Sequence, residues 1–319
     1  MPVSSSILET IGNTPLVDVS PLAEARGLLG RLLVKCEYFG PGSSKKDRIA
    51  LEMIREAKRQ GDLQPGQTVI ELTSGNTGTG LAIVCRSLGH PLIAVMSKGN
   101  TVERARMMRA LGAEVVLVEQ APNSIPNQVS GEDLESVEER TREIALDRGA
   151  YRCDQFASVG NVGAHERQTG PEIWRQTDGE IDVFLDFAGT GGTFTGVMRH
   201  LRKMKPDIRG YLGEPSNASV LAGSRVTNAS HKIQGGGYSR TVLPLLDRGL
   251  VEGYLRVTDQ EATDGARALA REAGVFAGFS SGANLAAAYQ LLADRESGKT
   301  IVFLAGDSGL KYLSTDLFP

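Results

Sequence analysis

The sequence predicts an α/β protein with two domains, each a mostly parallel sheet covered by helices. Three observations support this prediction. Strand-like and helix-like segments alternate along the chain with short links, which is typical of parallel sheets with helices on both faces. The length of 319 residues is too great for one small core. The 38 glycines gather at strand-to-helix joints, where the backbone can approach a ligand closely.

The first half of the chain contains four apolar strand signals, each followed by a helical pattern. Short apolar runs indicate buried strands, and longer amphipathic runs indicate helices. One of the helical runs ends at Gly112, a common helix stop. The expected strands are residues 32–36, 68–72, 92–96 and 115–118, and the expected helices are residues 49–60, 80–88, 102–111 and 132–147.

The second half repeats this alternation. The expected strands are residues 183–187, 210–214, 255–257 and 301–305, and the expected helices are residues 194–204, 259–273 and 283–292. One polar stretch, residues 122–131, interrupts the rhythm between the two halves with two prolines and no apolar periodicity. We expect a surface loop there, either a tolerated insertion or a lid or partner-binding patch.

Composition excludes several classes of function. A formal net charge of −3 and a pI near 5.9 give no electrostatic reason to expect binding to nucleic acid or an acidic membrane. No apolar run approaches the length of a membrane span, and we find no secretory signal. Cys36, Cys85 and Cys153 have neither metal-ligand nor redox spacing. We therefore expect reduced thiols, a cytoplasmic location and no metal.

The first chemistry-bearing segment is residues 73–78, between an expected buried strand and a helix. Backbone N–H groups at such a helix start bind anions, and the hydroxyls of Thr73, Ser74 and Thr77 add donors that suit a carboxylate. The amide of Asn76 offers both a donor and an acceptor to a ring oxygen. Ordinary helix capping is the alternative interpretation of the same residues.

A second glycine-rich segment also follows an apolar strand and precedes a helix. Its N–H groups and hydroxyls can turn onto a phosphate. Phe194 stands where a dinucleotide-binding motif needs its third glycine, and no Gly-Lys-Ser/Thr follows, so a nucleotide site is disfavoured. The segment consists of Gly189, Thr190, Gly191, Gly192 and Thr193.

A pair of lysines precedes the segment at residues 73–78 by about 25 residues. Lys45 and Lys46 lie in the run Ser-Lys-Lys-Asp-Arg at residues 44–48. A surface lysine is the usual interpretation of either residue. Lysine is, however, the residue that forms a Schiff base with a carbonyl cofactor. A lysine, an anion loop and a phosphate loop in this order together point to pyridoxal phosphate and an amino-acid substrate.

Read in order, these residues resemble the cysteine synthase and cystathionine β-synthase family of fold type II pyridoxal-phosphate enzymes. The resemblance covers nearly the whole chain. It includes ILETIGNTPL at residues 7–16, the two glycine-rich segments, QF at 155–156, TGPEIW at 169–174, HKIQG at 231–235, SSGA at 280–283 and YLST at 312–315.

The resemblance implies a role for each matching residue. Lys46 rather than Lys45 would hold the cofactor aldehyde and then remove the Cα proton. Asn76 would bond the ring hydroxyl, Ser280 would face the pyridine nitrogen, and the 189–193 segment would hold the phosphate. Together with the loop hydroxyls of Thr73, Ser74 and Thr77, Gln155 would hold the substrate carboxylate.

The reaction implied is β-replacement on O-acetylserine, or a related activated serine, through an aminoacrylate, with sulfide or a thiol giving L-cysteine. A neutral hydroxyl at Ser280 does not enforce protonation of the ring, which favours loss of a β-leaving group. The resemblance also implies a homodimer with a small mobile domain, residues 40–154, that closes over a large one formed by residues 1–39 and 155–319.

Departures from the family pattern leave the substrate open. Lys45 replaces a usually apolar residue and is expected to point to solvent. Tyr238 stands where cystathionine β-synthases carry a tyrosine, so condensation of serine with homocysteine is an alternative, and β-elimination from cysteine is another. A non-catalytic relative that binds the cofactor and regulates a partner is disfavoured, because Lys46, Asn76 and Ser280 are all present.

Overall fold

Two β-sheets organise the chain. The computed structural model describes residues 3–122, 124–125, 128–228 and 231–318. Its strands are β1 (Leu16–Asp18), β2 (Arg31–Cys36), β3 (Val69–Leu72), β4 (Leu92–Ser97), β5 (Glu114–Val118), β6 (Tyr151–Arg152), β7 (Val183–Phe187), β8 (Arg209–Pro215), β9 (Gly253–Val257) and β10 (Thr300–Ala305).

The larger sheet has the strand order β1-β2-β10-β7-β8-β9, and the smaller has the order β5-β4-β3-β6. Every pairing is parallel except that of β1 with β2, which is antiparallel. The prediction of an α/β fold with mostly parallel sheets is confirmed. The short edge strand β1 was not predicted, because three residues are too few to show a period.

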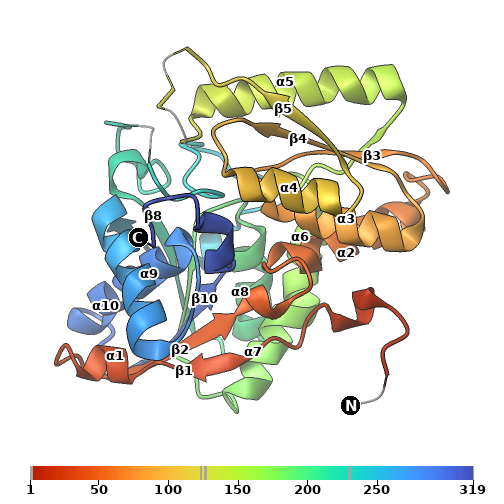
Figure 1. Cartoon of the computed structure of the whole chain (residues 1–319). Coiled ribbons are helices and arrows are strands. Elements are labelled where there is room, and N and C mark those ends of the chain that lie inside the picture. The colour runs from red at the N-terminus through yellow and green to blue at the C-terminus, as the bar shows by residue number, and fades with distance from the viewer. Residues whose placement is uncertain (1–2, 123, 126–127, 229–230, 319) are drawn as a thin grey trace.

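Helices separate and cover these strands (Figure 1). They are α1 (Pro21–Glu24), α2 (Lys46–Gln60), α3 (Asn76–Leu88), α4 (Val102–Ala110), α5 (Gly131–Arg148), α6 (Val159–Ala164), α7 (Gly170–Gln176), α8 (Gly192–Met204), α9 (Asp259–Ala273) and α10 (Phe279–Ala293), with a π-turn at His165–Thr169. No helix in the described ranges is long and apolar enough to cross a membrane.

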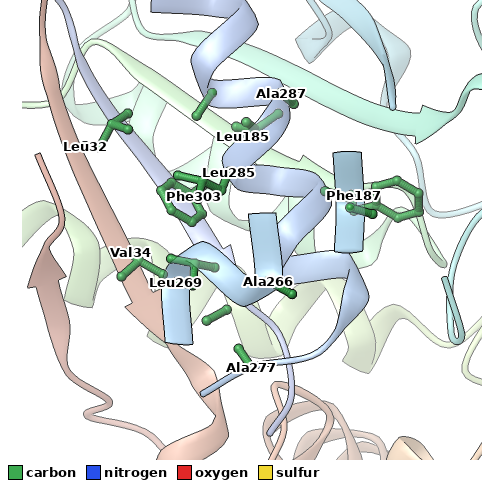
Figure 2. Packing of buried hydrophobic residues seen from close by; sticks show 14 of the residues in the cluster. Leu32, Val34, Leu185, Phe187, Ala266, Leu269, Ala277, Leu285, Ala287 and Phe303 are labelled. Atoms are coloured by element: carbon green, nitrogen blue, oxygen red, sulfur yellow. The ribbon is translucent and has the colours of Figure 1, made fainter. Parts of the chain in front are cut away.

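Both faces of the larger sheet are buried, which explains the continuous apolar runs of its strands. On β10, Ile301 and Phe303 join one core cluster, and Val302 and Leu304 join another. The first cluster fills the space under α9 and α10 and includes Phe303 and Leu285 (Figure 2). The second cluster packs against α7 and α8. Burial of each such side chain contributes about 1.5–3 kcal/mol.

The smaller sheet is covered in the same way. Along β4, Leu92, Ala94 and Met96 face the cluster formed with α2, α3 and α4, while Ile93 and Val95 face the one formed with α5. In Figure 1 the strands β3–β5 form an upper group under α5, and the strands of the larger sheet form a lower group. A boundary at residues 39/40 and 154/155 assigns the two sheets to different domains; that boundary and any domain movement stay predictions.

The loop predicted at residues 122–131 includes positions 123, 126 and 127, which lie outside the described residues. Its described part is irregular. Near its end Ser130 caps α5, because its hydroxyl accepts from the N–H of Asp133 while the Asp133 carboxylate accepts from the N–H of Ser130. The predicted acidic helix at 132–147 therefore begins and ends within one residue of the observed α5.

Candidate active site

A pocket between the two sheets, beyond the carboxyl ends of the larger sheet's strands, gathers residues from segments far apart in sequence. This is the usual ligand position in open α/β sheets. Every predicted cofactor-binding residue except Gly192 lines it. The lining includes Lys45, Lys46, Asn76, Asp186, Gly189, Thr190, Gly191, Thr193, Gln234, Ser280, Gly306 and Asp307.

Lys46 is the first residue of α2, and its side chain is buried. Its amine makes no hydrogen bond or ion pair with any described residue. Burial and the nearby charge of Lys45 lower the pKa of Lys46 to about 7. A large fraction of Lys46 is therefore the neutral, nucleophilic amine near neutral pH.

A buried ionic network fixes the first turn of α2. The Arg48 guanidinium donates to Glu37 at 2.7 Å and to Glu172 at 2.6 Å, and Lys35 also donates to Glu172 at 2.8 Å. These partners lie on β2, just after it, and on α7. Removal of one partner from such a network costs about 3–5 kcal/mol, because a buried charge is left uncompensated. The network holds the Lys46 backbone against the larger sheet.

The expectation that Lys45 points to solvent is wrong. Its amine donates to both carboxylate oxygens of Asp186, at 2.7 and 2.9 Å, and 16% of its side chain is exposed. The backbone N–H of Lys45 donates to the carbonyl of Gly306 at 2.8 Å, which turns the side chain into the pocket. The carboxylate that attracts it lies on β7, 141 residues away, so the local sequence gave no sign of it.

The predicted phosphate loop joins β7 to α8. Gly191 has φ +84°, a conformation that favours glycine. Two side chains from the segment before it hold the threonine hydroxyls. Asn161 donates to Thr190 Oγ1 at 3.0 Å, and His165 Nε2 lies 3.2 Å from Thr193 Oγ1. Burial and neighbouring cations lower the pKa of His165 well below its usual value, so its ring is neutral.

His165 and Asn161 are the residues that sequence reasoning missed here. Neither residue was assigned a role from the sequence. Their contacts with Thr190 and Thr193 span 29 and 28 residues. The one available signal was that both precede the Thr-Gly-Pro-Glu-Ile-Trp motif in a segment without apolar periodicity.

The loop fits a phosphate group. The first N–H groups of a helix have no carbonyl partner within it, and those of α8 are presented by this loop. The surroundings of Gly191 and Gly192 leave no room for a side chain. A Cβ on Gly192 would lie 2.2 Å from Asn161, and one on Gly191 would lie 2.8 Å from Leu246. A neutral amine on Lys46 in the same pocket suits the aldehyde of a phosphorylated cofactor.

Asn76 is held in one orientation at the edge of the pocket. Its amide N–H donates to Asp307 at 2.8 Å, and its carbonyl accepts from Lys311 at 2.8 Å. Asp307 also accepts from the Tyr312 hydroxyl at 2.9 Å and lies 3.5 Å from Arg104. The second N–H of the Asn76 amide remains for a ring oxygen. These supporting residues were not predicted, because each lies far from Asn76 in sequence.

Ser280 lies in the first turn of α10 and lines the pocket beside Gly306. Its hydroxyl and the Lys45 stem both lie 3.7 Å from the position that a Cβ on Gly306 would occupy. Ser280 is therefore close to Lys45 as well as to the predicted cofactor position.

The predicted carboxylate-binding residues lie beside this pocket rather than in its lining. Thr77 donates to Gln155 Oε1 at 2.6 Å, and Gln155 donates to the carbonyl of Leu72 at 3.0 Å. The Thr73 hydroxyl oxygen accepts from the N–H groups of Gly75 and Gly78, both at 2.9 Å. Thr73 therefore shapes the loop, while Thr77 and Gln155 hold each other. Their contact with a substrate carboxylate stays a prediction.

Ser74 and Tyr238 come together at the same loop. Their hydroxyl oxygens are 3.5 Å apart, and the Tyr238 ring packs edge-on against Phe156 with centroids 5.8 Å apart. The Ser74 carbonyl accepts from Arg104 at 2.8 Å. Tyr238 lies in the segment between β8 and β9 of the larger sheet, and its side chain packs against the core cluster under α5.

The cysteines form no second site. All three are buried and unpaired. Burial raises the pKa of Cys36 to about 11 and that of Cys85 to about 12, and it raises the pKa of Cys153 as well, so none is a ready thiolate. Among the described residues, no group of three or more His, Cys, Asp or Glu side chains is arranged to hold a metal ion.

Comparison with known proteins extends these observations. A family profile described as "Pyridoxal-phosphate dependent enzyme" matches residues 7–307. Cysteine synthase 3 of Caenorhabditis elegans is 41% identical over 314 residues, which cover 97% of this chain and 88% of that protein. Cysteine synthase A of Salmonella typhi is 40% identical over 317 residues, and the match covers 97% of this chain and 94% of that protein. The crystal structure of O-ureido-L-serine synthase superposes with a TM-score of 0.89 at 36% identity, covering 99% of this chain and 96% of that one.

Proposed function

This chain belongs to the family of pyridoxal-phosphate dependent enzymes, and we propose that it catalyses β-replacement on O-acetylserine or a related activated serine. Its cofactor is pyridoxal 5′-phosphate. Sulfide or a thiol is the proposed nucleophile, and L-cysteine is the proposed product. The observation that carries the proposal is the convergence of the buried, partnerless Lys46 amine, the oriented Asn76 amide, the 189–193 loop and the Ser280 hydroxyl in one pocket.

Each of these groups has a distinct task toward the cofactor. The N–H groups of the loop and the hydroxyls of Thr190 and Thr193 would hold the phosphate, Asn76 the ring oxygen, and Lys46 the aldehyde carbon. When bound, pyridoxal phosphate supplies an electron sink for bonds to the substrate Cα.

Lys46 would also move the substrate proton. An amine whose pKa is lowered to about 7 is neutral in enough molecules to accept a proton from Cα, and it remains basic enough to hold that proton. Ser280 would offer an uncharged hydroxyl to the ring nitrogen, and a neutral hydroxyl does not enforce ring protonation. This combination favours departure of a β-substituent over a long-lived carbanion.

The loop at residues 73–78 would bind the substrate carboxylate. The α3 N-terminus and the Ser74 hydroxyl offer donors, and the pair formed by Thr77 and Gln155 braces the loop from behind. We propose that carboxylate binding draws the small domain, residues 40–154, over the pocket and excludes water.

Tyr238 favours a second candidate, condensation of serine with an amino-acid thiol such as homocysteine. Its hydroxyl lies 3.5 Å from Ser74 and can act at the same loop as the substrate carboxylate. Tyr238→Phe and Tyr238→Ala would separate the candidates. A loss with homocysteine and none with sulfide supports condensation, and an unchanged profile supports cysteine synthesis.

A spectroscopic experiment tests the main proposal. The holoenzyme is mixed in turn with O-acetylserine, O-phosphoserine, serine and cysteine, and the visible absorbance of the bound cofactor is recorded. We expect O-acetylserine to change the spectrum and sulfide to restore it with release of cysteine. A response to cysteine alone, with release of sulfide, would indicate β-elimination instead.

Borohydride reduction followed by peptide mass spectrometry tests the attachment residue. The mass of the reduced cofactor should appear on Lys46, because Lys45 is ion-paired with Asp186. Modification at another residue would contradict the assignment.

A homodimer in the cytoplasm is the last part of this proposal. The family resemblance supports the dimer, and the unpaired state of all three cysteines suits a reducing compartment. Light scattering during gel filtration would give the mass in solution, which is about 68 kDa for two chains of 34.0 kDa.

A further inference from the structure

Lys45, Lys46 and Asp186 all line the cofactor pocket, and the proposed function uses only Lys46 of the three. Lys46 carries out the chemistry assigned above. Lys45 and Asp186 line the same pocket and form a mostly buried ion pair, with 16% and 5% of their side chains exposed. Burial of an ion pair carries a desolvation penalty that a solvent-exposed Lys45 would avoid.

We propose that Asp186 and Lys45 are positioning residues: the carboxylate holds the Lys45 ammonium inside the pocket, where its positive charge keeps the neighbouring Lys46 amine free of its proton. This inference rests on the proposed function, in which Lys46 is the attachment residue. It assigns a task to a residue pair that the catalytic roles do not explain.

The geometry fixes Lys45 from both ends. Its backbone N–H donates to the Gly306 carbonyl at 2.8 Å, so the chain just before α2 is tied to the end of β10. Its stem runs past Gly306, with Cε 3.7 Å and Cδ 3.8 Å from the position of a Cβ there. At the far end the amine donates to both oxygens of Asp186. Without that carboxylate, nothing in the described residues would hold the amine inward.

The charged groups around Lys46 make Lys45 the main cation that acts on it. Asp186 on β7 and Glu71 on β3 oppose its effect, and burial raises the pKa of Glu71 to about 7. His165, on the π-turn, is neutral because its pKa is lowered well below the usual value. Burial and Lys45 together outweigh the two carboxylates, since the pKa of Lys46 is lowered to about 7.

The other acids near the pocket are already engaged. Asp47 accepts from the N–H of Gly42 at 2.8 Å, and Asp307 accepts from Asn76 and Tyr312. Lys45 is therefore the cation whose removal should most directly change the field at the Lys46 amine, and Asp186 is the residue that holds it there.

The test measures the protonation of Lys46 in the full-length, cofactor-free chain. Competitive acetylation with a trace of acetic anhydride is followed from pH 5 to 9, and the labelled Lys46 peptide is quantified by mass spectrometry. In the wild-type chain we expect half-maximal labelling near pH 7. Lys45→Met should move this midpoint up by about one pH unit, so that labelling at pH 6 falls about tenfold. Lys45→Arg keeps the cation and should leave the midpoint unchanged.

The role of Asp186 is tested by a double-mutant cycle. In an Asp186→Ala background Lys45 is no longer held, so the shift caused by Lys45→Met should shrink to less than half. The double variant contains no unpaired charge from this pair, so it also serves as the folded control. An equal shift in both backgrounds would show that Asp186 does not position Lys45.

Failure of this inference and failure of the proposed function give different results. If Lys45→Met leaves the midpoint in place while borohydride still traps the cofactor on Lys46, the positioning role is wrong and the attachment residue stands. If the cofactor is trapped elsewhere, the proposed function itself is wrong. A disturbance of packing alone would lower cofactor affinity in Lys45→Arg as well, without moving the midpoint.

Discussion

The helix starts of α8 and α3 are built alike and are supported differently. Each follows a buried parallel strand, each is preceded by a glycine with positive φ (Gly191 at +84°, Gly75 at +118°), and each is rich in threonine. Both helix starts are therefore suited to bind an anion. The resemblance ends at the residues that support the polar side chains of each loop.

At α8 the support comes from the adjoining helical segment. Asn161 and His165 fix Thr190 and Thr193, and both lie among the helices that cover the larger sheet. At α3 the support crosses between the two sheets. Asn76 is bonded to Asp307 and Lys311, which follow β10. We propose that the α8 loop holds the cofactor phosphate in place, and that the α3 loop both orients the cofactor ring through Asn76 and receives the substrate carboxylate.

The largest expected effect comes from removing the amine that lies between the two loops. Lys46→Ala should lower kcat by about 1,000-fold or more, because it removes both the attachment point and the base. Steady-state assays with O-acetylserine and sulfide would measure this. Lys58→Ala, at the exposed end of the same helix, is the matched control and should retain normal turnover. Near-normal activity in the Lys46 variant would contradict the proposed site.

A smaller effect is expected from crowding the α8 loop. The methyl group in Gly192→Ala would meet Asn161 at 2.2 Å, so the loop must shift. We expect cofactor affinity to fall about tenfold, equivalent to about 1.4 kcal/mol, by equilibrium dialysis against pyridoxal phosphate. Gly131→Ala, at the open first position of α5, provides the control, because nothing lies within 4 Å of its added Cβ. Equal losses in both variants would mean that the close fit is irrelevant.

Removing one hydrogen bond from each loop should affect different constants, because the two loops are proposed to bind different groups. Gln155→Ala removes the acceptor of Thr77 and should raise the KM for the amino acid about fivefold while cofactor affinity stays within about twofold. Thr193→Val should give the opposite pattern. If both variants change the same constant, the division of tasks between the loops is wrong.

The smallest expected effect concerns the pH dependence of stability and depends on Glu71, which lies on β3 just before the α3 loop. Burial raises the pKa of Glu71 to about 7 from its ordinary value of 4.5. The folded state therefore binds the proton more tightly than the unfolded state, and the stability that this group contributes is full below about pH 4.5 and is lost as the pH rises through about 7. The Tm of Glu71→Gln should rise relative to the Tm of wild type as the pH increases from 5 to 8.5. Thermal unfolding of both proteins at each pH would measure this difference. A constant Tm difference across this range would contradict the shift.

Much of the fold was determined by local sequence. Each core strand listed from its apolar run lies within two residues of the observed strand, because strands buried on both faces must be apolar throughout. The expected helices were also found, but α2, α3, α8 and α10 begin two to four residues earlier than expected, and the short helices α1, α6 and α7 were not predicted. Their first turns carry Gly, Thr, Ser, Asn and Lys in place of apolar periodicity. Those same turns form the candidate site, so the pattern failed where the residues serve a ligand.

The tertiary structure alone decided how the site residues are supported. The sequence with its family resemblance indicated Lys46, Asn76, Ser280 and the 189–193 segment, because their spacing along the chain is informative. It could not place Lys45, since its ion pair with Asp186 depends on the start of α2 meeting the end of β7. The contacts of His165 and Asp307 likewise depend on segments that are distant in the sequence and packed together in the fold. Local periodicity reports burial, whereas the partner of a polar group is fixed when distant segments pack together.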